Sequence, residues 1–270
     1  MNSNLFYDNS VCNIMGILNI TPDSFFDGGE YKTVEEAVER AMEMIDEGAK
    51  IIDVGGESTR PGSKGVSIEE ELNRVIPVIE TIKNRCDVNI SIDTKKVEVA
   101  KKAIEVGAGM VNDVSGLTNP EMVKLVSEFG VYVVIMHMQG TPVDMQEKPQ
   151  YGDVVNEIKN WLNERVENAI NNGIERERIL IDPGIGFGKT LEHNLEILKR
   201  INEFVGIAGG VMVGASRKSF IEHLSGAEPE ERMGGSLSAA VVSALSGVNI
   251  VRVHDVKESK QAIDLVNAIR

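Results

Sequence analysis

The chain has 270 residues, of which 42% are hydrophobic, and carries a formal net charge of −14, with a pI near 4.8. This length can bury a large core in one α/β barrel or in two smaller domains. The strong negative charge argues against nucleic acid or an anionic membrane as the main partner, because both require a dense basic surface.

No Pro-rich, Ser-rich or low-complexity linker divides the sequence, so we expect one domain over residues 1–270. The two cysteines, Cys12 and Cys86, lack the spacing of a metal site. No apolar run approaches transmembrane length, and the first residues do not resemble a signal peptide. We therefore expect a cytoplasmic protein.

Short apolar runs rich in Val and Ile recur along the chain, and a helical pattern follows each of them. The runs are residues 11–18, 50–54, 88–92, 110–111, 131–136, 179–181, 211–213 and 250–253. Parallel strands that are buried on both faces give such continuous apolar segments. The pattern predicts an eight-stranded parallel (β/α) TIM barrel, with a doubly wound open sheet as the alternative.

Capping residues indicate where several helices begin. Thr33 with Glu36 and Ser67 with Glu70 are predicted capping boxes, each followed by apolar residues at helical spacing. Pro120 is expected in the first turn of another helix, a position that tolerates proline. These signals support a helix after each of the strands concerned.

Polar residues stand where the apolar runs end, and this common position favours the barrel, whose binding face lies at that end of its strands. Hydrogen-bond acceptors follow the middle strands, and cations follow the last two. Such a rim can hold a polar ring and an anion side by side. The rim residues are Asn19, Arg60, Asp93, Asn112, Asp113, His137, Asp182, Lys218, Arg252 and His254.

Asp182 ends one apolar run and is followed by a glycine-rich turn. A phosphate loop would need glycine at Pro183, and a dinucleotide fingerprint would need glycine at Lys189, so both nucleotide motifs fail on spacing. With Asn112, Asp182 could accept hydrogens from a guanidine-like edge of a heterocycle. The alternative is that both residues only cap the helices that follow them.

The segment 216–219, Ser-Arg-Lys-Ser, is expected to offer backbone N–H groups and cations to an anion, although a solvated basic turn is also possible. His193 and His223 fall within predicted helices, which favours a surface or packing role. No zinc-ligand spacing and no Gly-x-Ser-x-Gly elbow is present.

Taken together, the rim segments resemble the dihydropteroate synthase family, and the resemblance covers essentially the whole chain in the same order. The matching segments are 19–25, 57–62, 92–94, 112–113, 136–142, 182–184, 187–189, 216–219 and 252–255. The family has an eight-stranded barrel. It joins p-aminobenzoate to 6-hydroxymethyl-7,8-dihydropterin pyrophosphate and releases pyrophosphate with the help of Mg²⁺.

This resemblance implies a pterin pocket built from polar side chains, with two apolar side chains beside the ring. The polar residues would be Asp93, Asn112, Asp182 and Lys218, and the apolar ones Met136 and Phe187. By the same resemblance, Arg252, His254 and Asn19 would face the pyrophosphate and its metal, with Asn19 as the metal ligand.

The resemblance also implies that Ser219 completes the aminobenzoate site together with residues of the first two loops, namely Phe25, Thr59, Arg60 and Pro61. These loops, 21–29 and 57–65, are rich in glycine and proline, so we expect them to be ordered by pyrophosphate and Mg²⁺ before aminobenzoate or a sulfonamide binds. A homodimer is a further implication of the resemblance.

Loss of pyrophosphate from a methylene on an electron-rich pterin leaves a delocalised cation that a weakly basic arylamine can attack. Positioning and electrostatic stabilisation would therefore carry most of the catalysis, through Lys218, Arg252, His254 and Asp93. Two other functions remain as alternatives: a pterin-binding barrel that transfers a methyl group from a folate, and a pterin-binding protein without catalysis.

Overall fold

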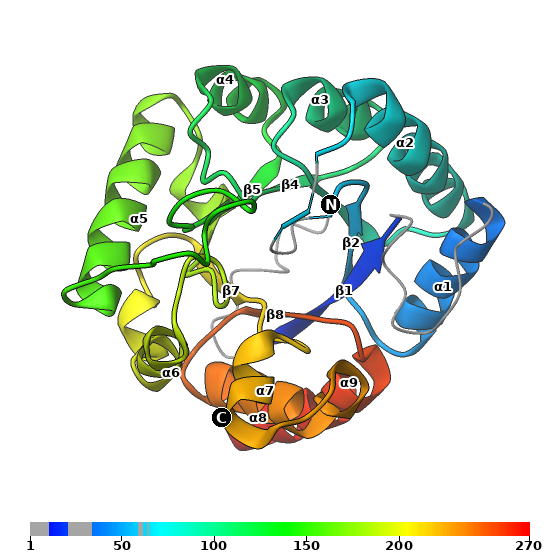
Figure 1. Cartoon of the computed structure of the whole chain (residues 1–270). Coiled ribbons are helices and arrows are strands. Elements are labelled where there is room, and N and C mark those ends of the chain that lie inside the picture. Colours follow the sequence, from blue (N-terminus) through cyan, green and yellow to red (C-terminus); the bar gives the residue numbers. More distant parts are fainter. Residues whose placement is uncertain (1–10, 21–33, 59–61, 64) are drawn as a thin grey trace.

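The computed structural model describes residues 11–20, 34–58, 62–63 and 65–270, and parallel strands within these ranges close into one barrel (Figure 1). The strands are β1 (Asn13–Asn19), β2 (Ile51–Gly55), β3 (Asn89–Asp93), β4 (Met110–Asp113), β5 (Tyr132–Met136), β6 (Ile179–Asp182), β7 (Gly210–Val213) and β8 (Ile250–Val253). Neighbouring strands follow chain order. The predicted TIM barrel is confirmed, and the open-sheet alternative is wrong.

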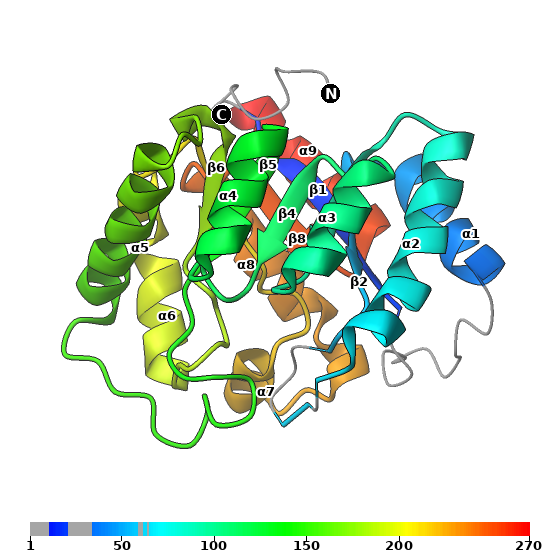
Figure 2. The same cartoon turned by 90° about the horizontal axis from the view of Figure 1, so that it is seen from above.

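Helices form a ring around the strands, as Figure 1 shows. They are α1 (Val34–Asp46), α2 (Ile68–Arg85), α3 (Val97–Glu105), α4 (Pro120–Phe129), α5 (Val154–Asn171), α6 (Leu191–Lys199), α7 (Ser219–Ser225), α8 (Met233–Leu245) and α9 (Val256–Ile269). Figure 2 places α7 and the connection from β5 to α5 on the same side of the barrel. Among the described residues, none of the helices has the length and apolar character needed to cross a bilayer.

Four strands, among them β1 with Asn19, extend into the polar residues that follow their apolar runs. The prediction of residues 110–111 was too short, because Asn112 and Asp113 still pair with Val134 and Ile135 of β5. The ladder uses backbone groups, so a polar side chain at the end of a strand does not stop it. Asp93 and Asp182 are likewise the last residues of β3 and β6.

Ser67 and Pro120 stand at helix starts as predicted, but only half of the predicted Ser67–Glu70 capping box is formed, because the Glu70 carboxylate accepts from Arg74. The Ser67 hydroxyl accepts a hydrogen bond of 3.1 Å from the backbone N–H of Glu70, and Pro120 stands in the first turn of α4. Thr33, the other predicted cap, lies outside the described residues. The apolar residues behind these caps then face the barrel.

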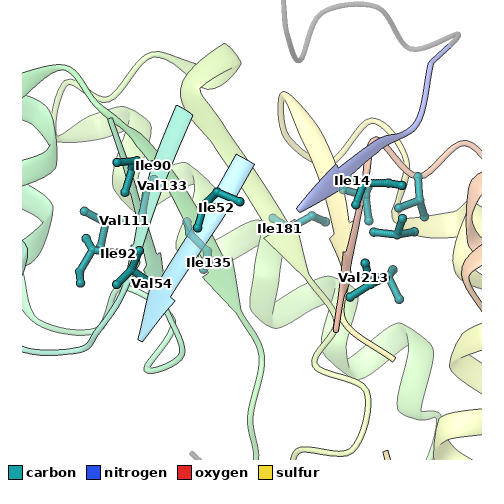
Figure 3. Close-up of a cluster of buried hydrophobic side chains, with 14 of the residues drawn as sticks. Ile14, Ile52, Val54, Ile90, Ile92, Val111, Val133, Ile135, Ile181 and Val213 are labelled. Atoms are coloured by element: carbon teal, nitrogen blue, oxygen red, sulfur yellow. The ribbon is translucent and has the colours of Figure 1, made fainter. Parts of the chain in front are cut away.

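The main hydrophobic core lies between the outer face of the barrel and the helices. Alternate strand residues point outward into it, and Figure 3 shows this layer. The strand residues labelled there are Ile14, Ile52, Val54, Ile90, Ile92, Val111, Val133, Ile135, Ile181 and Val213. This pattern follows from the two-residue period of a strand, because successive side chains point to opposite faces.

Inside the barrel the intervening residues form a separate apolar cluster: Met15, Ile51, Met110, Tyr132, Val134, Leu180, Met212 and Ile250. Two residues further along four of these strands, the same inward position holds Asp53, Asn112, Asp182 and Arg252. The interior is therefore apolar in its lower part and polar near the carboxyl ends of the strands. The alternation of side chains along each strand is sufficient to bring these polar groups together at that end.

The register brings three polar positions into one row. Asn19 pairs with Gly55, Gly55 with Asp93, and Asp93 with Asn112. A Cβ on Gly55 would lie 3.4 Å from Asn19 Oδ1 and 3.6 Å from Asp93 Cβ. Glycine therefore leaves the space between Asn19 and Asp93 open.

The seam between the first and last strands has additional support from a side chain. Asn13 to Gly16 of β1 pair with Ile250 to Val253 of β8. Beside this pairing, Asn267 on α9 accepts a hydrogen bond from Cys12 N (2.9 Å) and donates one to Cys12 O (3.0 Å). The amide of Asn267 thus satisfies the backbone just before β1.

The core between the barrel and the helices can be tested at Ile181. Its side chain is fully buried, so Ile181→Ala should lower the free energy of unfolding by about 2 to 5 kcal/mol, as large-to-small changes in cores do. The control is Val143→Ala, because Val143 is 71% exposed and should change stability by less than about 0.5 kcal/mol. Urea unfolding measures both, and equal effects would contradict the assigned core.

Candidate active site

Arg252 is the centre of a charge cluster at the mouth of the barrel. Its Nε donates to Asp53 Oδ2 (2.6 Å), and one terminal nitrogen donates to Asp93 Oδ2 (2.7 Å). The three residues come from β8, β2 and β3, and all point inward. One guanidinium therefore holds two buried carboxylates in a fixed arrangement.

Burial and charge set the protonation of this cluster. Burial raises the pKa of Asp93 to about 7, and the lowering effect of Arg252 does not overcome it, since the negative charge of Asp53 adds to the rise. Burial alone would lower the pKa of Arg252, but Asp53 and Asp93 raise it above its ordinary value. Arg252 is therefore charged, while Asp93 titrates near neutrality.

Asn112 is oriented by the same cluster. Its Nδ2 donates to Asp53 Oδ2 at 3.0 Å, so the amide presents Oδ1 as an acceptor. Asn112 Oδ1 and Asp93 Oδ1 are both buried and have no hydrogen-bond partner within the described part of the chain. Buried acceptors without donors are costly. The site is thus prepared to receive N–H groups from a ligand.

Asp182 ends β6 and accepts a hydrogen bond of 2.7 Å from the backbone N–H of Gly184. Burial raises its pKa, against the lowering effect of Lys218 and of that backbone N–H. Burial also lowers the pKa of Lys218 to about 8, although Asp182 opposes this change. Asp182, with its raised pKa, and Lys218, with its lowered pKa, therefore lie close enough to influence each other's charge.

Lys218 lies against the loop that follows β6. Its ammonium donates to the backbone carbonyl of Ile185 and stands 4.3 Å from the centre of the Phe187 ring. Met136, at the end of β5, pairs with Asp182 in the ladder and is buried. Met136 is thus next to Asp182 in the sheet, and Phe187 lies beside the ammonium of Lys218.

Two predicted rim residues serve loop structure. The carboxylate of Asp113 accepts hydrogen bonds from the backbone N–H groups of Ser115 and Leu117 and from the Ser115 hydroxyl. His137 Nδ1 lies 3.1 Å from Lys189 Nζ. Burial and the charge of Lys189 lower the pKa of His137 to about 3, so its imidazole is neutral. The Asp113 carboxylate therefore shapes the turn that follows β4.

Two buried residues were missed by the sequence analysis. Asp53 stands within an apolar run, and a single acid between Ile52 and Val54 was the available signal. Lys189 is buried and donates to the carbonyls of Phe187 (2.8 Å) and His137 (3.3 Å). Burial lowers its pKa well below the ordinary value. Both residues support groups of the pocket.

The residues predicted to bind an anion follow the ends of β7 and β8. His254 donates its backbone N–H to the Ser216 hydroxyl (3.2 Å), and His254 Nδ1 lies 3.0 Å from the same oxygen. Ser219 begins α7 next to Lys218. His193 and His223 lie in α6 and α7, as predicted. Cations and a helix start therefore share this side.

Asn19 is the predicted metal ligand and ends β1. Among the described residues, no three His, Cys, Asp or Glu side chains gather as a metal site. An amide oxygen at the rim still fits Mg²⁺, which takes one or two protein oxygens and completes its shell with water and phosphate oxygens. The donor chemistry therefore suits a cation held mainly by a phosphorylated ligand.

Four predicted binding residues, Phe25, Thr59, Arg60 and Pro61, lie outside the described residues. The flanking residues are described. Glu57 accepts hydrogen bonds from the backbone N–H of Val66 (3.1 Å) and from Lys96 (2.6 Å). The two ends of the segment 58–65 are thus joined by one carboxylate.

Comparison with known proteins gives one consistent family. The model of the family described as "Pterin binding enzyme" matches residues 15–254. Among curated relatives, the dihydropteroate synthase of Escherichia coli K12 is 49% identical over 255 residues, which are 94% of this chain and 90% of that protein. The Synechocystis enzyme of the same name is 42% identical, over 95% of this chain and 89% of the relative.

Solved structures agree with these relatives. A Yersinia pestis dihydropteroate synthase in complex with a sulfonamide drug superposes with a TM-score of 0.94 at 42% identity, covering 97% of this chain and 96% of that one. A Xanthomonas albilineans dihydropteroate synthase with 4-aminobenzoic acid gives a TM-score of 0.89 at 44% identity, covering 97% and 94%.

The pKa of Asp93 generates a prediction about stability. Because its folded value of about 7 exceeds the ordinary 3.8, its contribution to stability is complete below about pH 4 and is lost as the pH rises through about 7. The difference in free energy of unfolding between the wild type and Asp93→Asn should therefore fall by on the order of a few kcal/mol from about pH 4 to 8.

Urea unfolding of both proteins over this pH range measures that difference. His137 contributes with the opposite sign, since its pKa is lowered and its protonation below about pH 6.5 favours the unfolded chain. This contribution is present in both proteins and cancels. Parallel pH profiles for the two proteins would show that Asp93 does not titrate as described.

Proposed function

The chain belongs to the pterin-binding enzymes and, within them, to the dihydropteroate synthases, and we infer that it condenses p-aminobenzoate with 6-hydroxymethyl-7,8-dihydropterin pyrophosphate. The products are 7,8-dihydropteroate and pyrophosphate. One structural observation supports this assignment at the site itself. Two buried acceptors at the barrel mouth, Asp93 Oδ1 and Asn112 Oδ1, have no hydrogen-bond donor among the described residues.

In the proposed complex the pterin lies across the mouth of the barrel. Asp182 accepts the hydrogens of the amino-pyrimidine edge, and Asn112 and Asp93 accept from the remaining N–H groups. Lys218 leaves the Ile185 carbonyl and donates to a ring acceptor. Met136 and Phe187 contact the faces of the ring. A flat, donor-rich heterocycle fits a pocket whose described polar groups are mostly acceptors.

The pyrophosphate is proposed to lie beside Arg252 and His254, on the β7 and β8 side. Arg252 remains charged throughout, since its pKa is raised by Asp53 and Asp93. We propose Asn19 as the protein ligand of Mg²⁺, with the other ligands supplied by pyrophosphate and water. When bound, Mg²⁺ would neutralise charge that develops on the leaving group.

The reaction breaks the bond between the pterin methylene carbon and a pyrophosphate oxygen, and the electron pair leaves with the oxygen. The arylamine nitrogen then forms a bond to the methylene carbon and loses a proton to solvent. Asp93 is placed to stabilise the cationic pterin, and Arg252 and His254 to stabilise the departing anion. Lys218 orients the ring, so catalysis needs positioning and electrostatics.

For aminobenzoate we propose a site completed by Ser219 together with Phe25, Thr59, Arg60 and Pro61, the latter four from segments outside the described residues. The sulfonamide and 4-aminobenzoic acid complexes of related synthases support, by analogy, that this chain binds such ligands. A sulfonamide should therefore compete with aminobenzoate.

We also propose a homodimer that works in the cytoplasm. Several of the exposed large apolar side chains among the described residues belong to the last three helices: Leu224, Val242, Leu245, Leu265 and Ile269. Because α8 and α9 pack against each other, their exposed side chains supply apolar area for association of two copies.

The two alternative functions make different chemical demands. A folate methyltransferase would use a pterin pocket without a pyrophosphate, and a non-catalytic binder would release none. The relatives named dihydropteroate synthase, at 49% and 42% identity over nearly the whole chain, favour the synthase. The synthase reaction also accounts for the cationic side chains at the ends of β7 and β8, because it alone of the three functions provides a pyrophosphate for them to bind.

The activity itself is tested with the two substrates and a coupled assay for pyrophosphate. We expect release of pyrophosphate and dihydropteroate in equal amounts, loss of turnover after chelation, and recovery when Mg²⁺ is added back. Turnover that survives thorough chelation would refute the metal part alone. Pterin binding without any pyrophosphate release would favour the non-catalytic alternative.

Asp182→Ala tests the pterin pocket. Removing the carboxylate leaves the donors of the bound pterin unpaired, so the pterin affinity should fall by about 2 to 5 kcal/mol. Asp87→Ala is the matched control, because the Asp87 carboxylate is fully exposed. Calorimetry with pterin on both folded variants measures the loss. Near-native affinity in Asp182→Ala would remove Asp182 from the pocket.

A further inference from the structure

Arg217 has an unusual backbone conformation in the connection from β7 to α7. Its φ is +56°, in the left-handed region that glycine prefers. A side chain in this region costs on the order of 1 to 3 kcal/mol, and it persists only where surrounding contacts determine it. The contacts of Arg217 with its surroundings must therefore offset the free-energy cost of this conformation.

The contacts that hold Arg217 come from two other parts of the chain. Its Nε donates to Asp255 Oδ2 (3.0 Å), and a terminal nitrogen donates to Asp255 Oδ1, which makes a two-point ion pair. Its backbone N–H donates to the Ser236 hydroxyl (2.8 Å), and its carbonyl accepts from Arg232 (3.1 Å). Side chain and backbone are thus fixed independently.

The ion pair joins the connection that carries Lys218, proposed for the pterin ring, to the connection that carries His254, proposed for the pyrophosphate. Arg217 immediately precedes Lys218, and Asp255 immediately follows His254. Next to the ion pair, Ser216 Oγ contacts both the backbone N–H and Nδ1 of His254. The end of β7 and the end of β8 are therefore linked twice, once through Ser216 and once through Arg217.

We propose that the Arg217–Asp255 ion pair is a positioning device that fixes His254 against the connection from β7 to α7 for binding of the pyrophosphate part of the substrate. Asp255 neutralises the charge of Arg217, so the guanidinium contributes through geometry and not as an extra cation for the anion. The side chains of the pair are only 17% and 13% exposed, which limits the screening that weakens surface pairs. The inference rests on the proposed place of pyrophosphate beside His254.

The test separates the guanidinium from the strained backbone. Arg217→Gly relieves the left-handed conformation but removes the ion pair, whereas Arg217→Ala removes the ion pair and keeps the strain. Arg217→Lys keeps a charge but cannot make the two-point contact. Asp255→Ala removes the partner, and Lys124→Met is the control, since Lys124 is exposed and pairs with Glu128 on the surface.

Calorimetry gives the affinity of each folded variant for 6-hydroxymethyl pterin and for its pyrophosphate. We expect Arg217→Gly, Arg217→Ala and Asp255→Ala each to lose about tenfold in affinity for the pyrophosphate, with less than about twofold change for the bare pterin. Arg217→Lys should recover part of the loss. The double variant Arg217→Ala with Asp255→Ala should lose no more than either single variant, because the pair acts as one unit.

Three results would overturn the proposal: native pyrophosphate affinity in Arg217→Gly, equal losses for both ligands, or additive losses in the double variant. His254→Gln keeps the underlying assignment separate. If His254→Gln binds the pyrophosphorylated pterin as tightly as the wild type, the proposed anion site is wrong. If His254→Gln weakens it while the Arg217 variants do not, only the positioning role fails.

Discussion

The alternation of side chains along the strands is the constraint on which this structure depends. Each strand of the barrel sends every second residue outward to the helices and the intervening residues inward. The outward set is mainly apolar, as Ile52, Val54 and Ile181 show. The inward set changes from apolar to polar along the strand, for example from Ile51 to Asp53. A one-residue slip of any strand would exchange these sets and destroy core and site together.

Polar groups in a barrel interior are tolerated because they neutralise and orient one another. Arg252 satisfies one oxygen each of Asp53 and Asp93, and Asp53 also fixes the amide of Asn112. This network leaves defined acceptors without partners among the described residues. Burial of those acceptors costs free energy in the protein alone. A ligand with matching donors recovers that free energy, whereas a ligand without them does not. The unpaired acceptors therefore make binding specific.

The sequence could predict those residues whose role follows from their position at the end of an apolar run. Asp182, Asn112 and Asp93 were found this way, as was the barrel itself. Asp53 and Lys189 were missed, because their roles depend on which strands become neighbours and on how closely two loops approach. Gly184 illustrates the second point: a Cβ there would lie 2.0 Å from the carbonyl oxygen of His137. In the sequence, the glycine itself is the only sign of this close approach between two distant segments.

The seam of the barrel has a consequence for how the chain reaches this structure. Cys12 and Asn267 lie 255 positions apart in sequence and are joined by two hydrogen bonds, directly beside the pairing of β1 with β8. The other neighbouring strands can pair as soon as each βα unit exists, whereas this pairing must bring together almost the whole chain and carries the largest loop-closure entropy. During synthesis on the ribosome, β1 therefore waits with one edge unpaired until β8 and α9 have emerged. Arg252 lies on β8, so the charges of Asp53 and Asp93 remain without their guanidinium until that final closure.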